Sequence, residues 1–196
     1  MPLQDRIHSH FLASAQLKLE VAETLAPVIE RAALAIVQCL AQGGKVLACG
    51  NGGSAAHAQH FAAAMINRFE QDRPGLAAMA LTTDSATLTS VANDSTYAQV
   101  FARSIKALGL PGDILLAIST SGNSASVLEG VAAAHGRGIH VLALTGRTGG
   151  MLAEQMSDTD VLLCVPAQST ARIQEVHLLV IHCLCDAVDS VLLGVE

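Results

Sequence analysis

The chain has 196 residues, a length that accommodates one substantial domain and is short for two. Hydrophobic residues make up 51% of the sequence and aromatic residues only 3%, so a core must be built from Ala, Leu, Val and Ile, which suits helices packed on a sheet. A formal net charge of −6, without any lysine- or arginine-rich run, argues against direct binding to a nucleic acid backbone.

The N-terminal segment, residues 1–42, is predicted to be a helical arm. Apolar residues recur there at three- and four-residue steps, and Pro27 inside the pattern predicts a break between two helices. Asp5 and Arg6 precede any apolar block, and no run reaches the roughly 18 apolar residues that span a bilayer. The five cysteines are odd in number and contain no Cys-x-x-Cys pair, which is typical of reduced core residues. We therefore expect a soluble cytoplasmic protein that has no contact with a membrane.

The central segment, residues 43–168, alternates short apolar runs with helical patterns. It predicts strands at 45–49, 76–81, 113–118, 139–144 and 160–165, and helices at 55–69, 82–92, 97–108, 124–135 and 151–156. Such alternation predicts an α/β fold with a five-stranded parallel sheet flanked by helices. The last segment, 169–193, predicts a helix longer than one small sheet would bury. Together with the N-terminal arm, this helix predicts contacts between subunits and a homo-oligomer.

Two of the predicted strand-to-helix loops have the composition of an oxyanion site. They are Gly-Asn-Gly-Gly-Ser at 50–54 and Ser-Thr-Ser-Gly-Asn-Ser at 119–124. Glycine lets the backbone approach a ligand, and hydroxyl groups and free amides at a helix start supply donors. One glycine-rich turn is as often structural as functional, but two such loops favour a bound phosphate. The sequence has no P-loop motif and no dinucleotide fingerprint, so we expect a small phosphoester and no nucleotide cofactor.

These loops belong to a longer set of motifs that resembles the sugar isomerase (SIS) domain family over nearly the whole chain. The other matching segments are Ala58-Gln59-His60-Phe61, Asn67-Arg68-Phe69, Asn93-Asp94, Leu144-Thr145-Gly146 and Ala171 to His177. Within the family, the sequence is most similar to the phosphoheptose isomerases and to DiaA, the initiator-associating protein that binds the bacterial replication initiator DnaA. The resemblance implies a single SIS domain over 1–196 with a flavodoxin-like fold, a homotetramer, and sites at subunit interfaces.

The resemblance also implies which residues contact a sugar phosphate of the heptose 7-phosphate class. These are Asn51, Gly52, Gly53, Ser54, Asn93, Asp94, Ser119, Thr120, Ser121 and Ser124. All of these positions hold the residue type that the family pattern requires.

A second set, which the resemblance makes catalytic and zinc-binding, is incomplete. The family pattern has a His, a Glu one helical turn later, and a Gln and a His on the last helix; here these positions are His60, Ala64, Gln174 and His182. Alanine can neither accept a proton nor bind a metal, and losing a positioned acid or base typically costs about 10²- to 10⁴-fold in rate. His57, one turn before His60, is either a further metal ligand or a polar surface residue.

The position of the second histidine leaves its role open. Gln174 and His182 are eight residues apart, about 12 Å along a helix, so a shared zinc ion would need long reaches or two subunits. His182 is equally compatible with packing among apolar neighbours. His177 and Glu175 are expected to face solvent or a subunit contact.

The missing carboxylate leads us to expect a DiaA-like regulator that associates with DnaA, binds a sugar phosphate and has weak or absent isomerase activity. Ala64 and the segment Asn67 to Glu70 favour the DiaA branch, whereas Gly53, Ser121 and His182 keep the isomerase pattern. The alternative is a phosphoheptose isomerase that converts sedoheptulose 7-phosphate to glycero-manno-heptose 7-phosphate through His60, Gln174 and His182, with or without zinc. A third hypothesis, a sugar-phosphate sensor within a transcription regulator, is disfavoured because the sequence has no basic helix-turn-helix segment before the fold.

Overall fold

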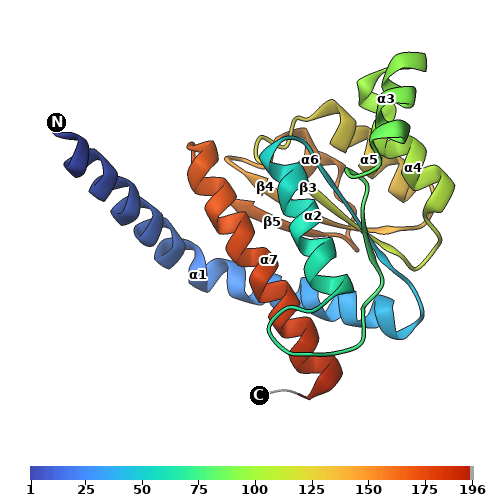
Figure 1. The fold of residues 1–196 in the computed structure, drawn as a ribbon, viewed down its shortest axis with the longest axis horizontal. Helices are drawn as coiled ribbons and strands as arrows, with labels where there is room; N and C mark the ends of the chain where they lie inside the picture. Colours follow the sequence, from blue (N-terminus) through green and yellow to red (C-terminus); the bar gives the residue numbers. More distant parts are fainter. Residues whose placement is uncertain (195–196) are drawn as a thin grey trace.

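A parallel sheet lies between two layers of helices in the computed structural model, which describes residues 1–194 (Figure 1). The helices are α1 (Leu3–Ala41), α2 (Gly53–Ile66), α3 (Ser85–Asp94), the 3-10 turn η1 (Tyr97–Gln99), α4 (Val100–Leu108), α5 (Ala125–His135), α6 (Gly150–Gln155) and α7 (Thr170–Leu193). The strands are β1 (Val46–Gly50), β2 (Ala78–Ala80), β3 (Ile114–Ser119), β4 (His140–Gly146) and β5 (Val161–Val165). The predicted α/β class with five parallel strands is confirmed.

The strand order, β2-β1-β3-β4-β5, places β1 and β3 side by side. All pairings are parallel, and Gly50 at the end of β1 pairs with Ile118 near the end of β3. The chain leaves β1 toward one edge of the sheet and leaves β3 toward the other. In open α/β sheets, a crevice opens outside the carboxyl ends of the strands at such a switch point. Both predicted oxyanion loops follow these two strands.

The core lies in two apolar layers because alternate residues of each strand face opposite sides of the sheet. Val46, Leu116 and Leu144 belong to the layer under α1, α2 and α7, whereas Leu47, Leu115 and Val141 belong to the layer under α4 and α5. Every residue of β1 and β3 is buried, as expected for parallel strands covered on both faces.

The predicted break in the N-terminal arm is wrong, because α1 runs through Pro27 as one helix of 39 residues. Proline removes one helical hydrogen bond and crowds the preceding turn. Here Pro27 is exposed, while Val21 and Leu25 before it and Ala32 and Ile36 after it are buried. Packing of one face on both sides of the proline therefore offsets the lost bond.

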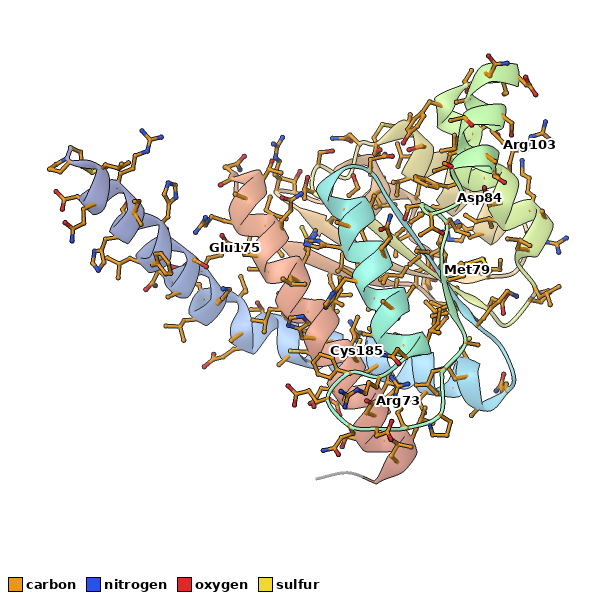
Figure 2. The ribbon with its side chains drawn as sticks, in the orientation of Figure 1. Arg73, Met79, Asp84, Arg103, Glu175 and Cys185 are labelled. Atoms are coloured by element: carbon orange, nitrogen blue, oxygen red, sulfur yellow. The ribbon has the colours of Figure 1, made fainter. Side chains whose placement is uncertain are left out.

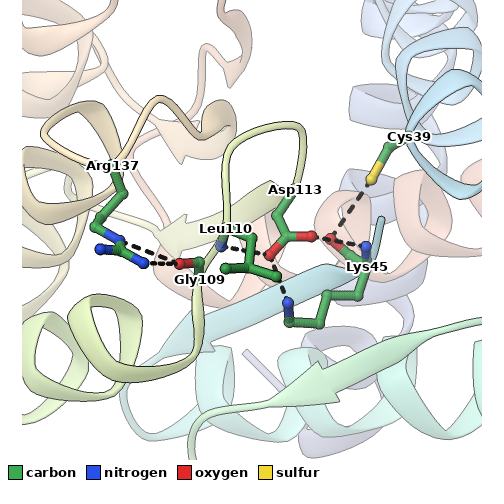
Figure 3. A network of polar contacts seen from close by, with 6 residues as sticks. All are labelled: Cys39, Lys45, Gly109, Leu110, Asp113 and Arg137. Carbon is green, nitrogen blue, oxygen red and sulfur yellow. Dashed lines mark hydrogen bonds and ion pairs between the residues drawn. The ribbon is translucent and has the colours of Figure 1, made fainter. Parts of the chain in front are cut away.

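The amino ends of β1 and β3 are held by a buried carboxylate (Figure 3). Asp113, which is 2% exposed, accepts hydrogen bonds from the Lys45 amide at 3.0 Å and the Leu110 amide at 2.8 Å. Its Oδ2 also pairs with Lys45 Nζ at 2.6 Å. These contacts fix the register of the two central strands at the end of the sheet opposite the loops.

The five cysteines are free thiols. Cys39, Cys49 and Cys185 are buried, and burial raises the pKa of Cys49 and of Cys185 to about 12. Thiols with such pKa values stay protonated and unreactive at neutral pH. The prediction of reduced core cysteines is confirmed for these three, whereas Cys164 and Cys183 are half-buried.

Two helices, α1 and α7, are long and apolar enough to cross a bilayer, by length and composition only. In α7 the apolar residues pack in the protein core, because residues such as Ile173, Val180 and Leu184 are fully or almost fully buried. In α1 five large apolar residues of the N-terminal half are exposed: Leu3, Ile7, Phe11, Leu12 and Leu19. This half extends away from the sheet (Figure 1).

Candidate functional site

The two oxyanion loops meet at the carboxyl ends of β1 and β3 and are joined by one side-chain amide. Asn51 Nδ2 in the first loop donates to Ser124 Oγ at 2.6 Å and to Ser126 Oγ at 2.8 Å. The Tyr97 hydroxyl in η1 donates to Asn51 Oδ1 at 2.8 Å. Three segments that are distant in sequence therefore converge on Asn51.

Each loop opens a helix whose first amides have no partner within the helix. α2 begins at Gly53 and α5 at Ala125, and neither N-cap residue, Gly52 or Ser124, caps its helix with a side chain. The two loops contain no charged residue, so any anion bound there is held by amides, hydroxyls and the helix dipoles. This donor set fits the phosphate that the loop composition predicts.

The second loop is hydrogen-bonded to the start of α6. Asn123 Oδ1 accepts from the Met151 amide at 3.0 Å, and Ser121 Oγ accepts from the Asn123 amide at 3.2 Å. Gly122 has φ +66°, and a Cβ there would overlap the Gly149 carbonyl oxygen, so only glycine fits this position. The hydroxyl-bearing residues Ser119, Thr120 and Ser121 are buried or half-buried on this fixed loop.

Asn93 and Asp94 are exposed at the end of α3, and Asn93 Nδ2 donates to Asp94 Oδ1 at 2.9 Å. Among residues 1–194, neither side chain forms a hydrogen bond with the two loops. Their connection to the loops runs through Tyr97, three residues after Asp94, which bonds to Asn51.

Gln174, in the first turns of α7, lies against the start of α2. A Cβ built on Gly53 would overlap Gln174 Nε2, so glycine at this position is what admits the amide. The structure thereby brings Gln174 to the first oxyanion loop.

The two other candidate catalytic residues, His60 and His182, meet between α2 and α7. Their Nε2 atoms are 3.0 Å apart, and the ring of Phe69 lies 5.6 Å from that of His182. At this distance one nitrogen donates a proton and the other accepts it, so at least one imidazole is neutral. Burial and the neighbouring His60 lower the pKa of His182, against a smaller opposing effect of Glu70. The pair therefore offers a free basic nitrogen near neutral pH.

The histidine pair stands apart from the first loop along the same helix. His60 follows Gly53 by seven residues, which corresponds to about 10 Å of helix. This separation suits an extended ligand with an anionic group at one end. Gln174, which lies at Gly53, is consequently separated from the pair that the sequence grouped with it.

His177 contradicts the prediction that it faces solvent, because its side chain is fully buried. Its Nε2 lies 2.8 Å from the Thr145 carbonyl oxygen, which fixes the proton on that nitrogen. Burial, with a smaller contribution from the nearby His57, lowers the pKa of His177 to about 4, against the opposing effect of the hydrogen bond to Thr145. His57, which is half-buried on α2, also has its pKa lowered by burial and by His60. Glu175, by contrast, is half-buried and pairs with Arg172 at 2.7 Å.

The buried imidazole predicts that the fold loses stability in acid. The unfolded chain protonates His177 near its ordinary pKa of 6.5, whereas the folded chain does so only near 4. The stability contribution is therefore complete above pH 6.5 and is lost as the pH falls toward 4, by about 3 kcal/mol in the free energy of unfolding. Urea unfolding of the wild type and of His177→Gln, whose amide can still donate to Thr145, should show a weaker pH dependence in the variant. Parallel curves would contradict this assignment.

Ala64, the position of the missing carboxylate, is 8% exposed and packs in the core. Its carbonyl oxygen accepts from Arg73 Nη2 at 3.0 Å. Within residues 1–194, no group of three or more His, Cys, Asp or Glu side chains is arranged to hold a metal ion. The histidine pair is therefore left without a carboxylate ligand beside it.

A separate cavity of about 590 Å³ lies beyond β2 and contains none of the predicted site residues. Met79, Asp84 and Arg103 line it from β2, the start of α3 and α4 (Figure 2). Asp84 is occupied as the N-cap of α3, where its Oδ1 accepts from the Thr87 amide at 3.1 Å.

Comparison with known proteins agrees with the motifs. A family model described as SIS domain matches residues 10–146. A relative from Thiobacillus denitrificans, named phosphoheptose isomerase, is 73% identical over 196 residues, which is 100% of both chains. The solved phosphoheptose isomerase of Neisseria gonorrhoeae has a TM-score of 0.92 at 53% identity and covers 96% of this chain and 100% of its own. That of Francisella tularensis has a TM-score of 0.94 at 48% identity, with coverages of 97% and 100%.

These relatives overturn the prediction of a DiaA-like regulator that associates with DnaA. Full-length relatives at 73% and 60% identity, and the two solved structures, are all named phosphoheptose isomerase. The wrong prediction came from Ala64, on the premise that the chemistry requires a carboxylate at that position. That premise overlooked the contact between His60 and His182, which places two acid–base groups together without residue 64.

Proposed function

The chain belongs to the SIS domain family, in its phosphoheptose isomerase branch, and we propose that it interconverts sedoheptulose 7-phosphate and glycero-manno-heptose 7-phosphate. The observation that carries this proposal is the 3.0 Å contact between His60, on the helix that starts at the first oxyanion loop, and His182 on α7. A neutral basic nitrogen and a phosphate-binding crevice are the two components that an aldose–ketose isomerisation of a phosphosugar requires.

The reaction moves a proton between C1 and C2 of the sugar through an enediol. A base must take the proton from the carbon next to the carbonyl group, and a second group must move a proton between the two oxygens. In the histidine pair, one Nε2 accepts while the other carries a hydrogen that it can donate. We assign the proton transfers to His60 and His182.

The spacing between the first oxyanion loop and His60 along α2 supports a long phosphosugar as the substrate. With its phosphate at the amides and hydroxyls of residues 50–54 and 119–124, the sugar would extend along α2 toward His60, about 10 Å away. Gln174, which lies beside Gly53 at the phosphate end, is positioned to hydrogen-bond the phosphate or the sugar hydroxyls next to it. Asn93 and Asp94 offer further polar groups at the mouth.

In this proposal a zinc ion would only assist the proton transfers assigned to His60 and His182. His60 and His182 would hold the ion, and a bound zinc would polarise the carbonyl oxygen of the sugar. The pair supplies two of the three or four protein ligands that zinc takes, and residues 1–194 offer no complete set of His, Cys, Asp and Glu ligands. Every step above is therefore assigned to side chains alone.

We further propose a cytoplasmic homotetramer. The exposed apolar residues in the N-terminal half of α1, among them Phe11 at 74% exposure, support burial of this half against other copies of the chain. Size measurement in solution tests the assembly, and a monomer would contradict it.

The activity is tested by incubating the purified protein with sedoheptulose 7-phosphate and measuring formation of the aldose, with added zinc and with a chelator. We expect turnover that is saturable in the phosphorylated sugar and much slower with sedoheptulose itself. Absence of turnover under both metal conditions would refute the isomerase, whereas turnover only with zinc would assign the ion an essential role.

Gly53 provides a test of the crevice geometry. Replacing Gly53 by Ala should displace the Gln174 amide and lower kcat/KM by about 10- to 100-fold, because small displacements in an active site are costly to the rate. The fold should be unaffected, because the clash involves the end of a flexible side chain. Gln174→Ala should cause a similar loss, and the double variant should lose little more than either single one. Fully additive losses would show that Gly53 and Gln174 act independently.

A further inference from the structure

Tyr97 is the outermost member of a chain of hydrogen bonds that ends in the second oxyanion loop. The residue is 55% exposed, so burial does not account for its position. Its hydroxyl donates to Asn51 Oδ1 at 2.8 Å, and η1, on which it lies, is separated from Asn51 by 46 positions in sequence.

The bond from Tyr97 favours one orientation of the Asn51 amide, because a phenol hydroxyl is a better hydrogen-bond donor than acceptor. A carboxamide has one acceptor oxygen and two donor hydrogens on nitrogen, and its orientation follows from its partners. With Oδ1 engaged by the phenol, Nδ2 is directed to Ser124 Oγ at 2.6 Å and Ser126 Oγ at 2.8 Å. In the opposite orientation the amide oxygen would face these two hydroxyls and would accept their protons.

The orientation of the amide in turn decides the role of the Ser124 hydroxyl. Because Ser124 Oγ accepts a hydrogen bond from Asn51, its own proton is free to donate. In the part of the chain that the structure describes, Ser124 Oγ donates to no protein acceptor. Donors and not acceptors are what a phosphate oxygen requires.

We propose that Tyr97 is a positioning residue for the phosphate: through Asn51 it sets the direction of the hydrogen-bond chain so that the Ser124 hydroxyl donates to the bound phosphate group. This inference rests on the proposed function only in taking a phosphosugar as the ligand. Tyr97 itself is not assigned a contact with the reacting carbons, since its hydroxyl bonds to Asn51 in the first oxyanion loop and the proton transfers are assigned to the histidine pair.

Kinetics separate this role from simple tethering of η1. Tyr97→Phe keeps the ring and removes only the hydroxyl, and we expect KM for sedoheptulose 7-phosphate to rise about 3- to 10-fold with kcat within about twofold of wild type. Gln99→Ala is the matched control, because Gln99 Nε2 donates to Glu129 Oε2 at 2.9 Å and tethers the same turn without touching Asn51. We expect this control to leave KM unchanged.

The route through Asn51 predicts non-additivity. In an Asn51→Ala background, Tyr97→Phe should cause no further rise in KM, because the hydroxyl no longer has an amide to orient. A full additional rise would assign Tyr97 a separate role and overturn the proposal, as would equal effects of Tyr97→Phe and Gln99→Ala.

A spectroscopic readout is available because the chain has one tyrosine and no tryptophan. Its tyrosine fluorescence therefore reports on residue 97 alone. Titration of the wild type with inorganic phosphate should change this emission saturably, and Asn51→Ala should abolish the change. If phosphate causes no change, the proposal fails whether or not the protein is an isomerase. If the wild type lacks turnover yet shows the phosphate signal, only the proposed function fails.

Discussion

Replacing His182 by glutamine is expected to lower kcat by about 10²- to 10⁴-fold, the usual cost of removing a positioned acid or base. Glutamine is close in size and can hydrogen-bond to His60, but it cannot take up a proton at neutral pH. The wild-type rate should fall as the pH drops below the ordinary range of histidine, because protonation of the pair removes the free nitrogen, and the pKa of His182 is already lowered by burial and by His60. Initial rates over a pH series with sedoheptulose 7-phosphate measure both effects.

The matched control is His140→Gln, at an exposed histidine where β4 begins, at the end of the sheet opposite the crevice. This variant should retain the wild-type rate. Thermal unfolding of both variants should show that the fold is intact. A His182→Gln protein that keeps more than a tenth of the wild-type kcat would remove His182 from the proton transfers and leave His60 to be tested alone.

Replacing Arg73 by methionine should cost about 3 to 5 kcal/mol in the free energy of unfolding, because it leaves a buried carboxylate without its partner. Arg73 Nε pairs with Asp189 Oδ1 at 2.6 Å, and the two side chains are only 1% and 5% exposed. The guanidinium group also donates to the carbonyl oxygens of Ala64 and Met65 at 3.0 and 2.8 Å. It therefore joins the segment after α2 to the last turns of α7, at the end of α7 away from Glu175 (Figure 2).

Denaturant unfolding at one fixed protein concentration measures this loss, since assembly would otherwise shift the apparent stability. Arg68→Met, at an exposed arginine five residues earlier, should change the stability by no more than about 0.5 kcal/mol. Adding Asp189→Leu to Arg73→Met should recover part of the loss, because no unpaired charge remains buried. If the double variant is less stable than Arg73→Met alone, the desolvation argument is wrong.

The fold could be predicted from sequence because its main elements have strong local signals. Buried parallel strands such as β3 give continuous apolar runs, and the glycine-rich or hydroxyl-rich loops after β1 and β3 follow directly. Pro27 misled because local chain chemistry predicts a break, whereas packing on both sides of the proline keeps α1 continuous. Tertiary contacts determine the continuity of α1, and the spacing of residues along one helix does not reveal them.

The candidate site was predictable only in its local parts. The loops are recognisable by composition, but the contact between His60 and His182 joins residues 122 positions apart and depends on how α2 packs against α7. The missing carboxylate at position 64 therefore outweighed a contact that no spacing along the sequence reveals. Tyr97 and Arg73 gave no signal, since a tyrosine in a turn and an arginine in a loop are common surface residues.

The packing of α2 beside α7 also determines when, during synthesis, each part of the proposed active site can form. Both helices start near the carboxyl ends of the strands and make three contacts along their length. Gly53 meets Gln174, His60 meets His182, and Arg73, in the segment after α2, pairs with Asp189. Both oxyanion loops and all five strands precede residue 182 in the chain and are therefore synthesised before it. The anion crevice can therefore assemble early, whereas the histidine pair exists only after the final helix has docked, which couples the chemistry to completion of the fold.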